Sequence, residues 1–404
     1  MSRWRGRAAN VALGAAALAL SLLALEAAAR AYVWSATRRP DAIRNPMARY
    51  DPLLGWSKPP GASGYLVRPE YRVRLTINSK GLRGPEYDYA KPAGARRVLL
   101  LGDSFTEGYT VEEGQTVRAR LEAALGATGC APHQVLNAGT AAWGTDQEYL
   151  FYRHEGQRYA PDVVALLFYY NDLYGDGFGD VGKPTFDLEG DDDRLVLTGS
   201  PVPPPRRAPE SNAYRLFPWR GSMALRLLSQ RTRAGNPALH ARLAAWGLVE
   251  PAPEVVPDAP AEFNPFGPRN PGEVAWLWRV TAAILRDLAQ EVRARGSELV
   301  VVYVPARFEV DDAAWEATRA QYGLGKKRWS RDKVFETLHA TCGRLGIDLI
   351  DPRGALRRTE AEGRRTYFPL DGHWTASGHA LVAEALAAHL RTRGLAGCPP
   401  TPAR

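Results

Sequence analysis

Cysteine is scarce in this chain of 404 residues, which contains only Cys130, Cys342 and Cys398. Three thiols without metal-ligand spacing exclude a disulfide-dense scaffold and a cysteine-based zinc site. In an oxidising compartment one disulfide can form. We predict the pair Cys342–Cys398, because these residues lie late in an expected helix and just after the last one. Three buried thiols are the alternative.

Lysine is also scarce, since 45 of the 52 basic residues are arginines. The net charge of +8 is spread along an Ala- and Pro-rich chain, and no basic block alternates with aromatic residues. A nucleic-acid site needs such a block, so we expect no nucleic-acid partner. A compositional bias toward arginine explains the charge.

Only one long run lacks charge: residues 8–25, which follow Arg3, Arg5 and Arg7 and end before Glu26. These 18 residues are just enough to span a bilayer as a helix. We predict that residues 1–33 are a membrane anchor and that the catalytic domain is extracytoplasmic, periplasmic or extracellular. A secretory signal cleaved near residues 27–29 is the alternative.

Beyond the anchor, the pattern predicts an N-terminal extension (34–95) with one alternating strand at 71–77. Strands and helices then alternate over residues 96–172 and 271–395, which predicts one α/β domain with a mostly parallel sheet covered on both faces. The expected strands are 97–101, 134–137, 162–169, 298–304 and 347–350, and the expected helices are 114–126, 146–158, 272–295, 331–345 and 375–392. A short tail, 396–404, follows.

An irregular insertion or cap, residues 173–270, interrupts this alternation. Its Asp176, Asp180 and run 191–193 lack the ligand spacing of a calcium loop, so we expect no metal site there. The acidic run is better placed in the turn of a hairpin between residues 185–188 and 195–197. Residues 221–247 are expected to be helical with an apolar face.

Three residues that could take part in catalysis closely follow three of the expected strands. Ser104 follows the apolar run 98–101, Gly139 follows the second strand, and Asn171 follows the third. Asp371 and His373 lie in a loop before the last helix. Because ligands of open α/β sheets bind at the carboxyl ends of the strands, these groups are expected to meet.

A serine hydroxyl attacks esters only with a base in hydrogen-bond reach, and His373 is the candidate base. Asp371 would hold its tautomer and stabilise the imidazolium. The N–H groups of Ser104 and Gly139 and the side-chain amide of Asn171 would form an oxyanion hole. His379 and His389, on the last helix, are expected to face solvent. No cofactor is required.

These residues resemble the SGNH/GDSL hydrolase superfamily, over about residues 96–172 and 272–392. Residues 102–108 (GDSFTEG) resemble its first block and 137–140 (NAGT) its second. Residues 171–172 (ND) and 371–373 (DGH) resemble the third and the last. The resemblance implies a three-layer α/β/α, flavodoxin-like fold. It also implies ester hydrolysis or acyl transfer through an acyl-serine on Ser104.

Two positions depart from the family pattern. Tyr169 stands where a glycine usually precedes the asparagine of the third block, which predicts a narrowed site or a re-aimed Asn171. In the last block one residue instead of two separates Asp371 from His373, and Trp374 follows. This Asp-x-His-Trp block is similar to alginate O-acetyltransferase-like proteins.

Three hypotheses follow for function. The first is a serine esterase that acts on ester-linked acyl groups of a glycan or lipid, with O-acetyl groups as candidates. The second is an O-acyltransferase that moves acetyl groups onto an exopolysaccharide. The third is a non-catalytic carbohydrate-binding subunit, which the filling of all four motif positions disfavours.

Overall fold

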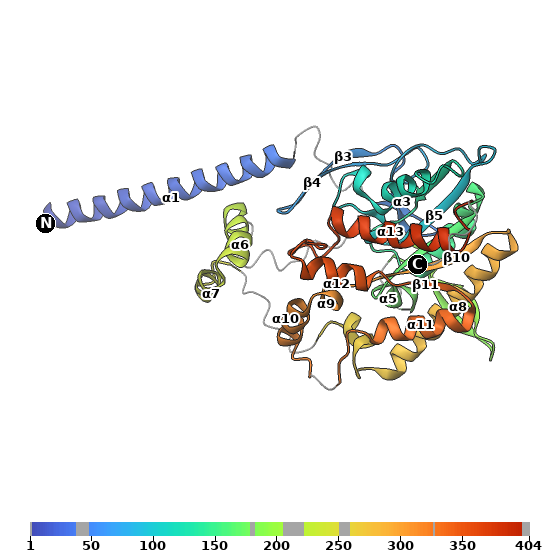
Figure 1. The fold of residues 1–404 in the computed structure, drawn as a ribbon. Helices are drawn as coiled ribbons and strands as arrows, with labels where there is room; N and C mark the ends of the chain where they lie inside the picture. Colours follow the sequence, from blue (N-terminus) through green and yellow to red (C-terminus); the bar gives the residue numbers. More distant parts are fainter. Residues whose placement is uncertain are drawn as a thin grey trace. The chain divides into compact units, whose positions relative to one another are not determined.

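The computed structural model describes residues 2–37, 48–177, 182–204, 222–249, 259–325 and 328–397 (Figure 1). They fall into two compact units. One comprises Met1–Arg44 and Arg206–Pro257, and the other comprises Asn45–Pro205 and Asp258–Arg404. The predicted domain boundaries stay predictions.

The larger unit is built on a five-stranded sheet in the order β11-β10-β7-β5-β6. Every pairing in it is parallel. The strands are β5 (Arg96–Gly102), β6 (His133–Asn137), β7 (Val163–Tyr169), β10 (Glu298–Val304) and β11 (Asp348–Ile350). This order is flavodoxin-like, with the topological switch between β5 and β7. The predicted α/β/α fold is confirmed.

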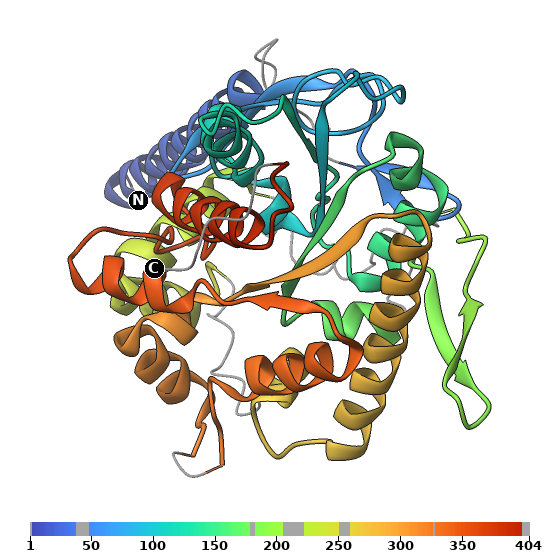
Figure 2. The ribbon, with the colours of Figure 1, turned by 45° about the vertical axis from the view of Figure 1, so that its right-hand side comes forward.

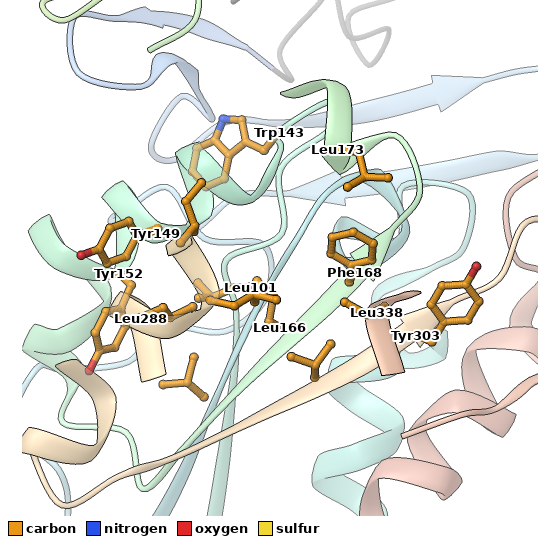
Figure 3. Packing of buried hydrophobic residues seen from close by; sticks show 14 of the residues in the cluster. Leu101, Trp143, Tyr149, Tyr152, Leu166, Phe168, Leu173, Leu288, Tyr303 and Leu338 are labelled. Carbon is orange, nitrogen blue, oxygen red and sulfur yellow. The ribbon is translucent and has the colours of Figure 1, made fainter. Parts of the chain in front are cut away.

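Helices cover both faces of the sheet (Figure 2). On one face lie α4 (Thr145–His154), α8 (Pro271–Ala294) and α11 (Lys333–Leu345), and on the other lie α3 (Val117–Gly126) and α13 (Ala376–Thr392). The strands read as continuous apolar runs because alternate side chains enter the two cores. Leu101, Leu166 and Phe168, for example, pack on the α4 and α8 side (Figure 3).

Short antiparallel pairs decorate this unit. The extension forms β1 (Arg49–Asp51) with β2 (Gly55–Ser57), and β3 (Ser63–Val67) with β4 (Arg72–Thr76). In the insertion, β8 (Thr185–Glu189) pairs with β9 (Arg194–Thr198), and the acidic run lies in their turn as predicted.

Several short helices were not predicted from the sequence pattern. They are α2 (Ser104–Glu107), α5 (Asp172–Gly177), α9 (Arg307–Val310), α10 (Asp312–Tyr322), α12 (Arg353–Ala361), and the 3-10 turns η1 (Glu113–Gln115), η2 (Gly156–Tyr159) and η5 (Ala261–Phe266). Most are too short for a helical period to emerge from the sequence.

Two expectations are wrong. Cys130 takes part in a disulfide bond, whereas Cys342 is a buried free thiol, so the pair Cys342–Cys398 does not form. Cys398 lies outside the described residues. His379 is 1 % exposed rather than solvent-facing, because it lies on the side of α13 that packs against Trp374. His389, by contrast, is partly exposed and hydrogen-bonds Asp348.

The smaller unit contains α1 (Ser2–Thr37), α6 (Met223–Gly235) and α7 (Pro237–Ala245). Within α1, residues Ala12–Tyr32 are long and apolar enough to cross a membrane. The predicted start of this span was Ala8 and its end Leu25, so the apolar helix continues past Glu26. An anchor and a signal sequence both satisfy this criterion, and the helix is consistent with a secreted or a membrane-anchored protein.

Candidate active site

Ser104 lies at the sharp transition between β5 and α2. Gly102 ends the strand with φ at 151°, and a Cβ built there would lie 2.0 Å from Oγ1 of Thr106. Asp103 caps the helix by accepting the N–H of Phe105 at 2.8 Å. The Ser104 N–H therefore belongs to the first turn of a helix, whose N–H groups lack intrahelical acceptors. A hydroxyl and an N–H donor thus come from one residue at the strand end.

His373 joins Ser104 to Asp371. Oγ of Ser104 is 2.8 Å from Nε2 of His373, and Nδ1 of His373 is 2.7 Å from Oδ1 of Asp371. An ionised carboxylate only accepts hydrogen bonds, which assigns the ring proton to Nδ1. Nε2 is then free to accept the Ser104 proton. The three side chains that the sequence motifs singled out are therefore in contact.

Two tyrosine hydroxyls complete the surroundings of the Asp371 carboxylate. The Tyr71 hydroxyl donates to Oδ2 at 2.7 Å. The Tyr109 hydroxyl lies 3.3 Å from Oδ1 and 3.1 Å from Nδ1 of His373. Burial acts to raise the pKa of Asp371, but hydrogen bonds from His373 and Tyr71 outweigh it and hold that pKa below its usual range. The carboxylate is therefore kept ionised and oriented.

Glu70 holds the backbone of the same loop. Its carboxylate accepts the N–H of Leu370 at 3.0 Å and the N–H of Asp371 at 2.7 Å. Glu70 and Tyr71 both precede β4 in the N-terminal extension. The N-terminal extension therefore contacts Asp371 in two ways. Tyr71 bonds to its side chain, and Glu70 bonds to the backbone of the loop that carries it.

The expected oxyanion donors Gly139 and Asn171 follow the strands β6 and β7 of the sheet, but they differ in the hydrogen bonds that they make. Gly139 packs so closely on α2 that an added Cβ would be 2.4 Å from the Glu107 nitrogen. Its N–H donates to Oδ1 of Asn137 at 3.0 Å. For Asn171, Oδ1 is buried and has no hydrogen-bond partner among the described residues. The Gly139 N–H would have to be shared with Asn137 to serve an oxyanion, and in Asn171 the group that could donate is the side-chain NH2 rather than Oδ1.

Two buried ionisable side chains, Lys58 and Glu107, support the loop that carries Gly139. Nζ of Lys58 donates to the Gly139 carbonyl and, at 2.6 Å, to Oγ1 of Thr140. Oε2 of Glu107 accepts the N–H of Ala141 at 2.8 Å. Desolvation lowers the pKa of Lys58 to about 8, although the charge of Glu107 opposes the shift. Desolvation also raises the pKa of Glu107, with Lys58 the largest opposing influence.

Burial also affects the carboxyl group beside the nucleophile. Asp103 is fully buried, and desolvation raises its pKa to about 6 against the opposing influence of His373. Its Oδ2 lies 3.3 Å from Oγ of Ser104. Asp103 therefore serves as a helix cap whose negative charge lies close to the reacting pair.

Tyr169 and Trp374, which mark the two departures from the family pattern, both contact the ring of Phe105. Its ring centroid is 4.7 Å from that of Tyr169, 4.4 Å from His373 and 4.9 Å from Trp374. Trp374 is fully buried. Trp374 belongs to the Asp-x-His-Trp block that is similar to acetyltransferase-like proteins, and it packs behind His373. Because its side chain is buried, it does not contact an acceptor that enters from solution.

Sequence reasoning missed Lys58, Glu70, Tyr71 and Tyr109. The alternating pattern located the strand that starts near Tyr71, but no pattern indicates what the first residue of a strand contacts. Lys58 sits in a Pro- and Gly-rich stretch that gives no periodic signal. Contacts that span 300 residues can be found only in the fold.

Comparison with known protein families gives a match over the C-terminal part of the chain. Residues 275–403 match the family model of the SGNH hydrolase-like domain of the acetyltransferase AlgX. None of the curated proteins matches the chain.

Among solved structures, the acetylxylan esterase Axe2 of Geobacillus stearothermophilus is 13% identical with a TM-score of 0.39, and covers 76% of this chain and 97% of its own. A lipase/acylhydrolase of Enterococcus faecalis is 13% identical with a TM-score of 0.38, and covers 76% of this chain and 100% of its own. Over residues 275–403 the chain is similar to the AlgX domain, which confirms the predicted resemblance to SGNH hydrolases for that part of the chain.

Proposed function

We propose that the protein is a serine esterase that removes ester-linked acyl groups, with O-acetyl groups on a carbohydrate as the first candidate substrate and an acylated lipid as the second. The observation that carries the proposal is the chain of contacts from Ser104 through His373 to Asp371. The similarity to an acetyltransferase domain supports acetyl-ester chemistry.

Acylation would begin with attack of Ser104 Oγ on the ester carbonyl. A bond forms between Oγ and the carbonyl carbon while Nε2 of His373 takes the hydroxyl proton. The oxyanion would be stabilised by the Ser104 N–H and the Asn171 amide, with Gly139 as a third donor. The carbon–oxygen bond to the alcohol then breaks, and the imidazolium returns its proton to the leaving oxygen.

Deacylation would reverse these roles with water as the nucleophile. Nε2 takes a proton from water, the hydroxide adds to the acyl-serine carbonyl, and the bond to Oγ breaks. The proton returns to Oγ, and free acid leaves. Asp371, held by Tyr71 and Tyr109, would stabilise the imidazolium in both halves.

A second candidate function is acetyl transfer to a sugar hydroxyl. The match of residues 275–403 to an acetyltransferase domain favours it, and the matched range contains Asp371, His373 and Trp374. The same groups would serve, with the acceptor hydroxyl in place of water. The burial of Trp374 means that this residue does not itself select the acceptor.

We also propose that α1 anchors the enzyme and that the larger unit works outside the cytoplasm. The apolar stretch Ala12–Tyr32 and the three arginines before it support this placement. A cleaved signal sequence is the competing possibility. Its removal would be seen directly as a mature N-terminus beyond residue 27.

The test uses the full chain in detergent. The wild-type protein should hydrolyse p-nitrophenyl acetate, and Ser104→Ala should abolish turnover. Rapid quenching should reveal wild-type protein heavier by one acetyl group, located on Ser104 by peptide mass spectrometry. Equal rates for both proteins would contradict catalysis and favour a non-catalytic carbohydrate-binding subunit.

Hydrolysis and transfer are separated in the same reaction. Xylo-oligosaccharides are added, and free acetate and acetylated sugar are both quantified. Free acetate as the main product supports the esterase. Acetylated sugar that forms faster than acetate establishes the transferase instead.

A further inference from the structure

The helices α6 and α7 carry an unusual balance of charge. Residues 222–249 contain Arg226, Arg231, Arg233 and Arg242 and no aspartate or glutamate. In the chain as a whole, by contrast, 44 acidic residues accompany 52 basic ones. A basic helical segment with a hydrophobic side is typical of binding to an anionic membrane surface.

The helix pair has a small core of its own. His240 is 1 % exposed and its Nδ1 lies 3.0 Å from Oγ1 of the buried Thr232, while Leu243 and Val249 are also buried. Ser222 and Asn236 cap the two helices through their side chains. These contacts explain how the pair keeps its structure.

Four large apolar side chains are left outside that core. Trp246 is 71% exposed, and Leu239, Leu248 and Leu228 are 40%, 40% and 39% exposed. Leu239 lies on α7, and Trp246, seven residues later, follows the end of α7 in a helical conformation, so both lie on one side of the helix with the exposed Arg242 between them. Tryptophan, leucine and arginine on one face match the boundary between lipid headgroups and acyl chains, where arginine extends its charge to the headgroups.

A direct contact joins this pair to α1. The carboxylate of Glu26 accepts the Ser222 hydroxyl at 2.7 Å, the Met223 N–H at 3.0 Å and the Ala224 N–H at 3.2 Å. The start of α6 is therefore fixed to the apolar helix at Glu26. These bonds also give a charged residue inside the Ala12–Tyr32 stretch the partners that it needs near lipid.

The position of Glu26 sets a depth. It precedes the end of the apolar stretch at Tyr32 by six residues, or roughly 9 Å at about 1.5 Å per residue. Interfacial helices bury their apolar face about 5–10 Å into the boundary between headgroups and acyl chains. A helix that starts at Glu26 therefore begins at the level where an interfacial helix lies.

We infer that α6 and α7 form a second membrane contact, which lies on an anionic phospholipid surface beside α1. Trp246, Leu239 and Leu248 insert among the upper acyl chains, and Arg226 and Arg242 bind phosphate groups of the lipids. This inference rests on the proposed placement of α1 in a bilayer. The smaller unit is then held at a fixed depth in the membrane by α1 together with α6 and α7, instead of by α1 alone.

The experiment places a benzophenone amino acid at single positions of the full chain in nanodiscs of phosphatidylcholine with 30 mol% phosphatidylglycerol, an amount on the order of that in anionic membranes. The test position replaces Trp246. A positive control replaces Leu18, exposed on α1, and a negative control replaces Leu197, exposed on β9. After irradiation, lipid and peptide adducts are quantified by mass spectrometry.

We expect lipid adducts at positions 246 and 18 at least tenfold above those at 197. We also expect the yield at 246 to fall at least threefold in pure phosphatidylcholine, or in the double variant Arg226→Ser with Arg242→Ser. Lipid adducts at 18 without adducts at 246 would overturn the inference and leave the anchor intact. Adducts from 246 to another part of the chain or to a second copy would identify a protein contact and overturn it. No lipid adducts at 18 would refute the membrane placement and this inference together, without bearing on the esterase activity.

Discussion

The hydroxyl of Tyr71 donates a hydrogen bond to Oδ2 of Asp371 across 300 residues of sequence, at 2.7 Å. This bond joins a strand of the N-terminal extension to the acid of the candidate active site. It is one of the interactions that lower the pKa of Asp371. Its removal should therefore have a measurable signature in the pH dependence of the reaction.

Tyr71→Phe should reduce kcat/KM and move the acid limb of the pH–rate profile to higher pH. Without the donor the pKa of Asp371 rises, so the carboxylate is neutralised at a higher pH on acidification. A hydrogen bond to a charged group contributes about 1.5–3 kcal/mol, which corresponds to a loss of roughly 10- to 100-fold. Values of kcat/KM measured from about pH 4 to about pH 9 would show both the loss of activity and the shift of the acid limb. Tyr65→Phe, on the paired strand β3, is the matched control and should leave the profile unchanged.

Gly139→Ala should abolish activity because the added methyl would collide with the backbone of α2. The new Cβ would lie 2.4 Å from the Glu107 nitrogen and 2.6 Å from Cβ of Thr106, so the turn that carries Ser104 must move. The matched control is Gly126→Ala in α3, where nothing lies within 4 Å. Turnover and thermal melting of both variants are measured. A fully active Gly139→Ala protein would contradict the tight fit.

Asn171→Ala tests the oxyanion hole. Loss of one such donor typically lowers kcat by about 10²–10³-fold, with little change in folding stability. Steady-state kinetics and a thermal melt of the variant supply both readings. An unchanged kcat would remove Asn171 from the mechanism and leave the backbone groups as the donors.

Lys58→Met should destabilise the fold and disturb the loop that carries Gly139. The change removes the hydrogen bonds to Gly139 and Thr140 and leaves the buried Glu107 with less positive charge around it. Leaving a buried polar group without its hydrogen-bond partner costs about 1–3 kcal/mol. Urea unfolding at neutral pH measures this loss. Lys80→Met, at a partly exposed position, should change the unfolding free energy far less.

His379 should make the protein sensitive to acid. Burial, aided by the charges of Arg83 and His373, lowers its pKa to about 3. The unfolded chain therefore binds a proton near pH 6.5, whereas the folded chain resists it until near pH 3. Stability contributed by the neutral ring is thus lost as pH falls below 6.5, by up to about 1.4 kcal/mol per pH unit.

The comparison is with His379→Gln, which does not titrate in this range. Urea unfolding of both proteins from pH 7 down to pH 4, over about three pH units, gives the difference in stability. That difference should favour the variant progressively at lower pH. A difference independent of pH would show that His379 does not titrate as its burial implies.

The fold was predictable because its central strands are easy to recognise in the sequence. The buried strands β5, β7 and β10 are unbroken apolar runs, since both faces of each are covered. The helix α8 has a regular apolar side. The helices α10 and α12 were missed because α10 has no buried residue and α12 buries Leu356 as its one apolar side chain, so neither segment contains a conspicuous apolar stretch.

The site was predictable only for residues that stand at strand ends or in recognised blocks. Ser104, Asp371 and His373 carried that signal, and they are in contact in the fold. Glu70 and Tyr71 reach the same point by tertiary packing, which no local pattern encodes. The burial of His379 was missed for a similar reason, because its position on α13 does not reveal that Trp374 covers it.

The separation between Tyr71 and Asp371 also governs when the enzyme can act. Tyr71 and Asp371 are 300 residues apart, so the acid and its hydroxyl partner meet only after all the residues between them have been made. A chain that crosses a membrane in an unfolded state would therefore be inert until its last helix arrives on the far side. Under the proposed location outside the cytoplasm, the order in which the chain emerges would keep Ser104 from forming an acyl-serine before export.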